Sequence, residues 1–463
     1  MNTRPAGVTD AMADFAVGHR PYPALARQRA LDAMIDCLAC MYAGSREPLA
    51  APLLKVLPTA DGESQRYPAL FIGTGRYGSA ADAALYNGAV AHALDYDDTN
   101  HPAYAHPSAV LLPALLAAAR MAGASGSELI DGYIAGFEIF GKLGRAMNTQ
   151  HYKRGWHATS SFGTLAATVA IARILKLSHR QTVMALGIAA SSASGLRANF
   201  GSMVKPLHAG YAARNAVLAA LLAREDFDAA PQALEHPYGY LSVFNAGIGF
   251  DTAPLMALGE DLEILTEHGL ALKPYPACGA THPGIEAALS LHPQLAGEGI
   301  AQVQAGVCEM AFSPLIYVMP HTPLEGKFSL HYCIAAALVF GEVNLSTFTD
   351  AKVADPRVRS LIPKISMKTD ERWRDDSEFA TEVIVTTETG RRLARHIALA
   401  AGKPDRWFSP EQLRAKFDDC THAFGSAFQH RVFTALRGLD SADDVLPLIE
   451  QLRLQEPASQ RAA

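Results

Sequence analysis

The pattern of apolar and polar positions divides the chain into two regions. Between about residues 25 and 223, alanine and leucine recur at helical spacing in successive segments that Gly, Pro, Ser or Asn residues separate. This spacing predicts that the first region is all helix. It contains no repeat of fixed period, which argues against a helical solenoid that acts only as a scaffold.

Local signals mark where several of these helices begin and end. Gly44 closes a helix that begins near Pro23. Pairs with the spacing of a capping box precede two others: Ser125 with Glu128 before residues 129–147, and Ser178 with Gln181 before residues 183–193.

Strands enter the pattern after about residue 265. Residues 300–311 alternate loosely between apolar and polar, and residues 382–387 and 393–396 flank a turn that contains glycine, as in a β-hairpin. Residues 284–291 and 329–341 keep helical spacing between them. This mixture predicts a smaller α+β domain.

The pattern is helical again after the break at residues 402–404. Ser409 followed by Pro410 has the form of an N-cap and a first helical turn. We therefore predict a mainly α protein in three segments: a large helical domain over residues 1–266, a smaller α+β lid domain over residues 267–400, and a helical tail over residues 401–463 that rejoins the first domain.

Composition and charge limit the class of protein. The 463 residues are enough for about two or three domains. With 49% hydrophobic and 19% charged residues the composition is that of a soluble globular protein, and no apolar run approaches the roughly 20 residues of a membrane span. The net charge of −6, without a basic stripe, argues against binding to nucleic acid.

The six cysteines are scattered and lack the spacing of a disulfide framework or of a metal cluster. Cys37 and Cys40 form a CxxC pair, but the apolar residues around them repeat at helical spacing, so we interpret them as core residues. The first residues lack the basic-then-apolar order of a secretory signal. We expect a cytoplasmic protein.

Residues 92–108 concentrate ionisable side chains between two apolar helical segments. The segment contains three histidines and three carboxylates, which are His92, Asp95, Asp97, Asp98, His101 and His106. Buried ionisable groups are costly unless they are paired, so such a cluster indicates a polar pocket in which protons move or a metal sits. By local pattern alone, Asp97 and Asp98 fit a helix end or a turn, and His101 fits a solvated loop.

Several short motifs follow one another in a specific order. They are Asn87-Gly88, His92-Ala-Leu-Asp95-Tyr-Asp97-Asp98-Thr99, His106-Pro-Ser108, Gly155-Trp-His157-Ala-Thr-Ser160 with Gly163-Thr164, Lys205-Pro-Leu-His208-Ala-Gly210, Lys273-Pro-Tyr-Pro-Ala-Cys278 with His282-Pro, and Lys327-Phe-Ser-Leu. Each motif is weak alone. Their shared order over most of the chain resembles the MmgE/PrpD family, which includes 2-methylcitrate dehydratase, cis-aconitate decarboxylase and iminodisuccinate epimerase.

The resemblance implies a large helical domain joined to a smaller α+β lid domain, with the pocket between them, in a homodimer. It also implies a small polycarboxylate substrate and chemistry that needs no metal or organic cofactor. The catalytic residues that it implies are Asp95, His106, His157, Lys205, Lys273 and, in the lid, Tyr317. The substrate-binding residues are Thr99, His208 and His282. The loop that ends at His106 is one residue longer than in the decarboxylases of the family.

These residue types suit proton transfer beside a carboxylate. Removal of such a proton builds enolate-like charge, which fixed cations such as Lys205 and Lys273 stabilise in a site poor in water. A histidine titrates near neutrality, so His106 or His157 can take or deliver the proton. Asp95 can set the tautomer of a neighbouring imidazole, as the carboxylate of a catalytic triad does.

The same groups serve three reactions, since loss of hydroxide is dehydration, loss of carbon dioxide is decarboxylation, and return of the proton to the other face is epimerisation. A carbon–oxygen lyase of the 2-methylcitrate dehydratase type is the leading hypothesis. A cis-aconitate-type decarboxylase and an iminodisuccinate-type epimerase are the alternatives, because a shared fold does not fix the reaction.

Two hypotheses from other classes remain open. A metal-dependent hydrolase would use four ligands: His92, Asp95, His101 and His106. An α-helical interaction protein would carry the same cluster as a surface loop. His157 also fits a residue ahead of a helix, and Lys205 with His208 fits helix packing, because residues three apart share a helical face.

Overall fold

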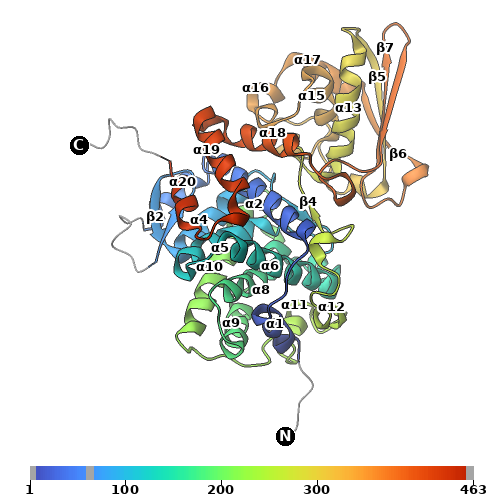
Figure 1. Cartoon of the computed structure of the whole chain (residues 1–463). Coiled ribbons are helices and arrows are strands. Elements are labelled where there is room, and N and C mark those ends of the chain that lie inside the picture. The colour runs from blue at the N-terminus through green and yellow to red at the C-terminus, as the bar shows by residue number, and fades with distance from the viewer. Residues whose placement is uncertain (1–6, 59–66, 455–463) are drawn as a thin grey trace. The chain divides into compact units, whose positions relative to one another are not determined.

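The computed structural model describes residues 7–58 and 67–454. They form two compact units, which Figure 1 shows with their labelled elements. One unit contains the residues up to Leu272 together with those from Ser409 onward, and the other is Lys273–Phe408. The predicted boundaries after residues 266 and 400 fall a few residues before these. The expected fold class, mainly α with a smaller α+β part, is confirmed.

Long helices form the interior of the larger unit, which we call the helical unit. They are α2 (Ala24–Gly44), α4 (Ala80–Ala91), α5 (Ser108–Ala122), α6 (Gly126–Met147), α8 (Ala158–Ile174) and α10 (Val204–Arg224). Helix α10 packs against α4 and α8, and α8 also contacts α5 and α6. The buried residues of α8 cover its whole circumference, as expected for a helix that other helices surround.

Helices α4 and α10 lie unusually close together where Gly88 faces Gly210. A Cβ atom on Gly88 would lie 2.9 Å from the Cα of Gly210, and a Cβ atom on Gly210 would lie 2.2 Å from the carbonyl oxygen of Leu85. Only glycine fits at such distances, because the neighbouring atoms belong to the backbone and cannot move aside. The two motif glycines therefore bring together the helices that carry His92 and His208.

The helix starts predicted at Ser125, Ser178 and Ser409 are present, and side chains cap them. The capping boxes are Ser125 with Glu128 at α6, Ser178 with Gln181 at α9 (His179–Ser192), and Ser409 with Gln412 at α18 (Pro410–Thr421). Helix α18 packs against α2, so the chain after Ser409 lies within the helical unit. Cys37 and Cys40 are fully buried free thiols of α2, as the core interpretation predicts.

The prediction that the first region is all helix is wrong at two places. Strands β1 (Pro68–Phe71) and β2 (Arg76–Ser79) form an antiparallel hairpin, and β3 (Thr99–Asn100) pairs with β4 (Leu270–Ala271). The hairpin turns through Gly73 and Gly75, which both have positive φ, and this turn chemistry overrides the helical pattern around it.

Shorter helices complete the helical unit. They are α1 (Val8–Val17), α3 (Ala50–Val56), α7 (Gln150–Lys153), α11 (Tyr240–Phe244), α12 (Ala253–Met256), α19 (Ser426–Arg437) and α20 (Leu446–Gln451). None of the helices formed by residues 7–58 and 67–454 is both long enough and apolar enough to cross a bilayer.

The smaller unit contains a sheet whose strands have the order β6-β5-β7-β8. These are β5 (Ile300–Val307), β6 (Ile365–Thr369), β7 (Thr381–Thr387) and β8 (Arg392–Ile397). Strand β5 runs parallel to β6 and antiparallel to β7, and β7 and β8 form the predicted hairpin around Gly390, which has φ 84°. Every second residue of β7 is buried, so one face of the sheet is turned to the core.

Helices α13 (His282–Leu295) and α15 (Leu330–Phe340) pack against each other and against this sheet, as Figure 1 shows. The other helices of the unit are α14 (Pro323–Lys327), α16 (Asp350–Val353) and α17 (Pro356–Leu361). The strand predicted over residues 300–311 ends early, because Glu309–Phe312 form a 3₁₀ turn.

Candidate active site

The candidate site of the helical unit is built on the connection between α4 and α5. His92 stands directly after α4, and Asp95 has φ 55°, a left-handed conformation that is uncommon for a residue with a side chain. Asn100 closes the connection on itself, because it pairs with Ala105 and its side-chain oxygen accepts a hydrogen bond from the Ala103 N–H. The segment thus folds back so that His92, Asp95, Asp97 and His106 face one another.

Asp97 lies between two imidazoles. Nδ1 of His92 lies 2.9 Å from Asp97 Oδ2 and 3.1 Å from Oδ1, and Nδ1 of His106 lies 3.3 Å from the same Oδ2. The side chains of His92 and Asp97 are fully buried, whereas the His106 side chain keeps 14% of its surface exposed. Asp97 therefore orients both rings, and solvent reaches the pair at His106.

Asp95 joins this group to a lysine. Lys205 Nζ donates a hydrogen bond of 2.8 Å to Asp95 Oδ1, and Nε2 of His106 lies 3.7 Å from that oxygen. Lys205 stands near the start of α10, beside Phe200. A paired ammonium group is thus held next to the partly exposed imidazole.

Two further histidines extend the group. Nδ1 of His157 lies 3.1 Å from Nδ1 of His208, and the rings of His157 and His92 are stacked with their centroids 5.7 Å apart. His157 is the N-cap residue of α8, and its N–H donates to the carbonyl oxygen of Gly195. The contacts form one continuous chain, which we call the His–Asp–Lys cluster: Lys205, Asp95, His106, Asp97, His92, His157 and His208.

Burial and charge set the protonation of the cluster. Burial lowers the pKa of His92 to about 4 despite the opposing effect of Asp97, and burial also lowers the pKa of His157 and that of His208. Burial alone would raise the pKa of Asp97, but the two imidazoles hold that pKa well below its usual range. His92 is therefore neutral, with its proton on Nδ1 facing an ionised Asp97.

The lysine of the cluster remains charged. Burial alone would lower the pKa of Lys205, but the charge and the hydrogen bond of Asp95 raise the pKa above its ordinary value. A permanent cation is therefore available for an anionic ligand.

Behind the cluster, a second layer of buried polar groups supports the connection. Asp98 accepts hydrogen bonds from the N–H of Ser108 at 3.0 Å and from its Oγ at 2.9 Å, and this Oγ lies 2.5 Å from the hydroxyl of Tyr133. Burial, followed by the charge of Asp97, raises the pKa of Asp98 well above its usual range. Asp98 thus ties the connection to the first turn of α5.

Lys416 of α18 supports the connection from the other side. Its Nζ lies 2.6 Å from Asp36 Oδ1 of α2 and donates a 2.7 Å hydrogen bond to the carbonyl oxygen of Tyr96. Both side chains of this ion pair are almost fully buried. Burial raises the pKa of Asp36 to about 6, although Lys416 opposes this effect.

The structure brings together most of the candidate residues of the helical unit. Asp95, His106, His157, Lys205 and His208 all belong to the His–Asp–Lys cluster. Thr99 is half-buried and its backbone pairs with Ala271 in the β3–β4 ladder. A contact of Thr99 with substrate stays a prediction.

Asp97 and Asp98 lie in the turn after α4, as their interpretation as helix-end or turn residues predicts, and Asp98 binds the first residue of α5. Both side chains are completely buried, which the local pattern did not indicate. His101, expected in a solvated loop, is half-buried and its ring contacts the rings of Tyr104 and His268. The local pattern did not indicate the burial of the two aspartates because it results from the fold of the connection, which brings His106 back to Asp97 and Ser108 back to Asp98.

The ligand set of the hydrolase hypothesis is also wrong. Among the described residues, the group close enough to hold a metal ion consists of His92, Asp97 and His106, whose ligand atoms all lie within 4.8 Å of one another. Asp95 and His101 are not part of it.

The candidate residues of the smaller unit have identified environments. Lys273 is buried at the first position of the unit. Nε2 of His282 lies 3.1 Å from the carbonyl oxygen of Ala277, and the ring contacts Tyr275. Tyr317 has 36% of its surface exposed, and its N–H points to the carbonyl oxygen of Phe328 at 3.5 Å. The catalytic or binding roles of these three residues stay predictions.

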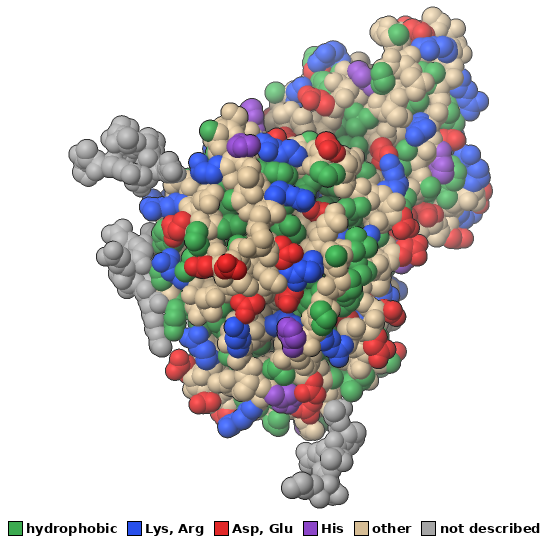
Figure 2. All heavy atoms as spheres, viewed as in Figure 1, with side chains coloured by type: hydrophobic (Ala, Val, Ile, Leu, Met, Phe, Trp, Pro, Cys, Tyr) green, Lys and Arg blue, Asp and Glu red, His purple; other side chains and the backbone are tan. Residues whose placement is uncertain are grey.

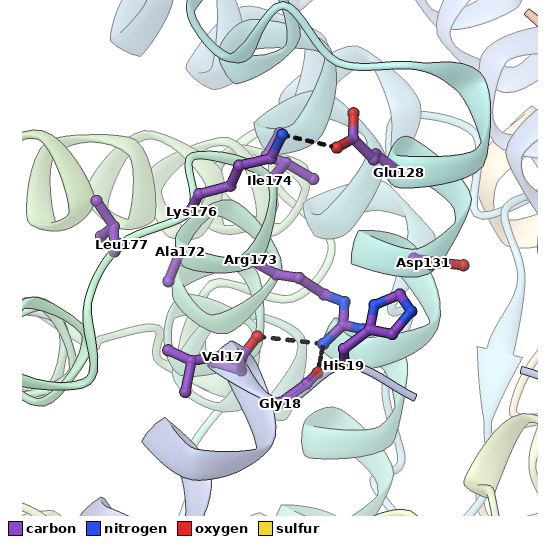
Figure 3. A pocket seen from close by; sticks show the side chains of 11 residues that line it. Val17, Gly18, His19, Glu128, Asp131, Ala172, Arg173, Ile174, Lys176 and Leu177 are labelled. Carbon is purple, nitrogen blue, oxygen red and sulfur yellow. Dashed lines mark hydrogen bonds and ion pairs between the residues drawn. The ribbon is translucent and has the colours of Figure 1, made fainter. Parts of the chain in front are cut away.

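A separate pocket of about 320 Å³ lies between the end of α1 and the end of α8 (Figure 3). Its cations are already engaged: Arg173 donates to the carbonyl oxygens of Ala16 and Gly18, and Lys176 pairs with Glu128. No residue of the His–Asp–Lys cluster lines it. Figure 2 shows acidic and basic side chains interspersed over the visible face of the described residues, an arrangement unlike the basic surface of a nucleic-acid binder.

The chain matches the MmgE/PrpD N-terminal domain over residues 10–253 and the MmgE/PrpD C-terminal domain over residues 275–437. It therefore belongs to the MmgE/PrpD family, and the resemblance seen in its motifs is confirmed.

Three similar proteins illustrate the range of the family. A cis-aconitate decarboxylase-like protein, oryM, of Aspergillus oryzae is 28% identical over 92% of this chain and 93% of its own length. The cis-aconitate decarboxylase of Mus musculus is 29% identical over 72% of this chain and 70% of its own length. The 2-methylcitrate dehydratase of Escherichia coli O157:H7 is 26% identical over 76% and 75%. All three names denote lyases, so the expectation of an enzyme from a lyase family is confirmed, and the hypothesis of a non-enzymatic α-helical interaction protein is wrong.

Proposed function

We propose that this protein is a lyase that moves a proton at a carbon atom beside a carboxylate group of a small polycarboxylate, without a metal or organic cofactor. The main support for this proposal is the His–Asp–Lys cluster, in which the charged ammonium group of Lys205 lies next to the partly exposed imidazole of His106. Asp95 holds the ammonium group of Lys205 in place, and Asp97 contacts the imidazole of His106.

His106 is the proposed acid–base group. It combines partial exposure with contacts on both ring nitrogens, Nδ1 to Asp97 and Nε2 to Asp95. Substrate can reach this ring, whereas Asp97 behind it is closed to solvent. A carboxylate that fixes the orientation of an imidazole supports proton transfer, as in a catalytic triad.

Lys205 is the proposed contact for substrate carboxylate. Its charge is secured by Asp95, and a fixed cation stabilises enolate-like charge as it develops. Lys273, Thr99 and His282 are further proposed contacts, supported by their places in the family motifs. Tyr317 is also a proposed contact, as the tyrosine that the family places in the lid.

Of the three reactions, we favour decarboxylation over the dehydration that led the sequence hypothesis. A decarboxylase-like relative from Aspergillus oryzae aligns over nine-tenths of both chains, whereas the mouse decarboxylase and the dehydratase both align over about 70–76%. With a cis-aconitate-type acid, the carbon–carbon bond to one carboxylate breaks and carbon dioxide leaves. The electron pair shifts through the double bond to the far alkene carbon, where His106 delivers the proton that forms the new carbon–hydrogen bond.

The test is incubation of the protein with 2-methylcitrate, citrate, cis-aconitate and iminodisuccinate, each separately, in deuterated water, followed by NMR. Decarboxylation gives a product that has lost one carboxylate and gained one deuteron on carbon. Dehydration gives an alkene without loss of carbon, and epimerisation gives the epimer of the substrate with a deuteron at the inverted carbon. No change in any of the four acids would overturn the proposal.

Independence from metal is tested in the same assay. After dialysis against EDTA and removal of the chelator, turnover is expected to stay unchanged. Loss of turnover that zinc, manganese or iron restores would contradict this part of the proposal.

The proposed assembly is a homodimer that uses α10. Tyr211, Leu218 and Leu222 are 38–40% exposed and lie seven and four positions apart, so they share one face of this helix. Met203, just before the helix, adds a further 53% exposed apolar side chain. A row of exposed apolar residues is typical of a protein interface.

Sedimentation analysis tests this assembly. Leu218→Glu is expected to convert the dimer into a monomer, whereas Val56→Glu, at an 80% exposed apolar position of α3, is expected to leave the dimer intact. A wild-type monomer would contradict the proposal.

The cytoplasm is the proposed location. All six cysteines are free thiols, and five of them are buried, which fits a reducing compartment. Fractionation of cells that express the protein checks this assignment.

A further inference from the structure

We propose that His92, Asp97 and His106 also form a binding site for a divalent transition-metal ion, and that an ion in this site blocks the enzyme. The ligand chemistry is two imidazole nitrogens and one carboxylate oxygen, with Nδ1 contributed by both histidines. The ion acts as an inhibitor because it occupies groups that the proposed reaction uses.

The spacing of the three side chains fits one ion. Both Nδ1 atoms converge on Asp97 Oδ2, His92 at 2.9 Å and His106 at 3.3 Å, and all three ligand atoms lie within 4.8 Å of one another. Because bonds from zinc to nitrogen or oxygen are about 2.0–2.2 Å long, ligand atoms around a tetrahedral ion are about 3.3–3.5 Å apart. Small side-chain rotations are enough to reach this geometry.

The surroundings of the ligands favour binding. Nδ1 of His106 is buried and makes no hydrogen bond of good geometry with any of the described residues. Its other nitrogen, Nε2, faces the Asp95 carboxylate at 3.7 Å. A carboxylate behind a ligating imidazole is the usual second contact of a metal-bound histidine, because it orients the ring and strengthens it as a ligand.

Access and charge are also suitable. The partial exposure of His106 leaves a path for the ion, and three protein ligands leave a fourth position open. The nearby ammonium group of Lys205 is compensated by Asp95, and Asp97 supplies a full negative charge to the ion. Two imidazoles with one carboxylate favour zinc, cobalt or nickel over calcium and magnesium, which prefer oxygen ligands.

The inhibition, unlike the binding, rests on the proposed function. An ion bound to Nδ1 of both histidines removes the contact through which Asp97 orients His106. It also places a positive charge beside the imidazole that must deliver a proton. Turnover of the substrate is therefore expected to stop while the ion is bound.

Equilibrium dialysis against zinc chloride, with metal content measured by mass spectrometry, tests the binding without any assay of turnover. Four proteins are compared: the wild type, His92→Gln, Asp97→Asn, and the control His179→Gln. Like His92 and His106, His179 has carboxylates as neighbours, since Asp10 and Asp14 lie within 3.8 Å of its ring. Its side chain, however, is 41% exposed.

The wild type and the control are expected to bind the same number of zinc ions. His92→Gln and Asp97→Asn are each expected to bind one zinc ion fewer, or to bind that ion at least tenfold more weakly. Circular dichroism identifies any variant that does not fold, and either remaining variant decides the result. A wild type without zinc, or variants that bind like the wild type, would overturn the proposal.

The inhibition is tested on the turnover of whichever acid the NMR experiment identifies. Zinc is expected to abolish turnover in the wild type, and EDTA is expected to restore it. If zinc binds but turnover continues, the inhibitory role is wrong while the site stands. If none of the four acids reacts, the function proposed above fails, and the dialysis result still decides whether the metal site exists.

Discussion

The two units differ in their most deeply buried ion pairs, although the helical unit also has exposed pairs such as Lys176 with Glu128. In the helical unit, the side chains of His92 and Asp97 are fully buried, and those of Asp36 and Lys416 are 0% and 3% exposed. In the smaller unit, Arg372 is 57% exposed in its pairs with Asp370 and Glu382. A buried charge depends on its partner, whereas an exposed charge can exchange its partner for water.

Because of this difference, substitutions of buried charges in the helical unit are expected to affect function and stability more than substitutions of exposed charges in the smaller unit. The proposed substrate contacts Lys205 and His106 keep only 19% and 14% of their side-chain surface exposed, and electrostatic effects grow as the dielectric constant falls. Each of these charges is also a potential source of instability.

The largest expected effect is on stability, through Lys416. In Lys416→Met, the buried carboxylate of Asp36 loses its ion pair, and the free energy of unfolding is expected to fall by about 3–5 kcal/mol. Arg372→Met is the matched change in the smaller unit, where we expect a loss below about 1 kcal/mol. Guanidinium denaturation followed by circular dichroism measures both. Equal losses of unfolding free energy in the two variants would contradict the expected difference between buried and exposed ion pairs.

The next effect is on catalysis, through Lys205. Lys205→Met removes the cation that Asp95 holds in the site, so kcat is expected to fall by about 10²–10³-fold. The control is Lys364→Met in the smaller unit, a 41% exposed lysine, for which we expect unchanged kcat. Steady-state kinetics on the identified acid compare the two. Full activity of Lys205→Met would contradict the assignment of Lys205 as the substrate contact.

A smaller effect concerns the close contact of α4 and α10. Gly210→Ala places a Cβ atom 2.2 Å from the carbonyl oxygen of Leu85, and such overpacking is expected to destabilise the protein by about 3 kcal/mol or somewhat less. Gly279→Ala in the smaller unit is the control, because its Cβ would meet no atom of the described residues within 4 Å. Thermal melting compares the variants. The same melting temperature for both would show that the two helices can move apart without cost.

The smallest effect concerns acid stability, through His151. Burial lowers its pKa to about 4, whereas the unfolded chain binds the proton near pH 6.5. The folded state is therefore fully favoured above pH 6.5 and loses up to about 1.4 kcal/mol per pH unit as the pH falls toward 4.

In His151→Gln, the loss of stability between pH 6.5 and pH 5 is expected to be smaller than in the wild type by about 2 kcal/mol. The side chain of His151 is completely buried against Phe162, so the exposed His422→Gln serves as the control for the loss of a histidine. Urea midpoints at the two pH values provide the measurement. A pH dependence equal to that of the wild type would contradict the link to His151.

Features with a local cause could be predicted from the sequence. The capping pairs at Ser125 and Ser178 and the hairpin around Gly390 depend on residues a few positions apart, so their patterns were sufficient. Hairpin β1–β2 was missed because an alanine-rich context hid its two turn glycines. Asn87 then fixes this hairpin to α4 through hydrogen bonds with Leu70 and Ile72.

The assignment of Asp95, His106 and Lys205 to the candidate site could be predicted from the sequence, because these residues lie in family motifs. That of Asp97 could not, because adjacent aspartates after a helix normally face water. Its burial results from the return of His106 across the connection. The pair of Asp36 and Lys416 has even less local signal, since each residue lies in an otherwise ordinary helix.

The ion pair of Lys416 has a consequence for the synthesis of the protein. Lys416 pairs with Asp36 and also donates a hydrogen bond to the carbonyl oxygen of Tyr96, which lies 320 positions earlier in the chain. The whole smaller unit is translated between Tyr96 and Lys416. A nascent chain that has emerged only as far as α10 carries Asp36 in α2 without the ammonium group that neutralises it. Completion of the helical core must therefore wait for α18, and a ribosome that stops before this helix releases a chain whose interior holds an uncompensated carboxylate.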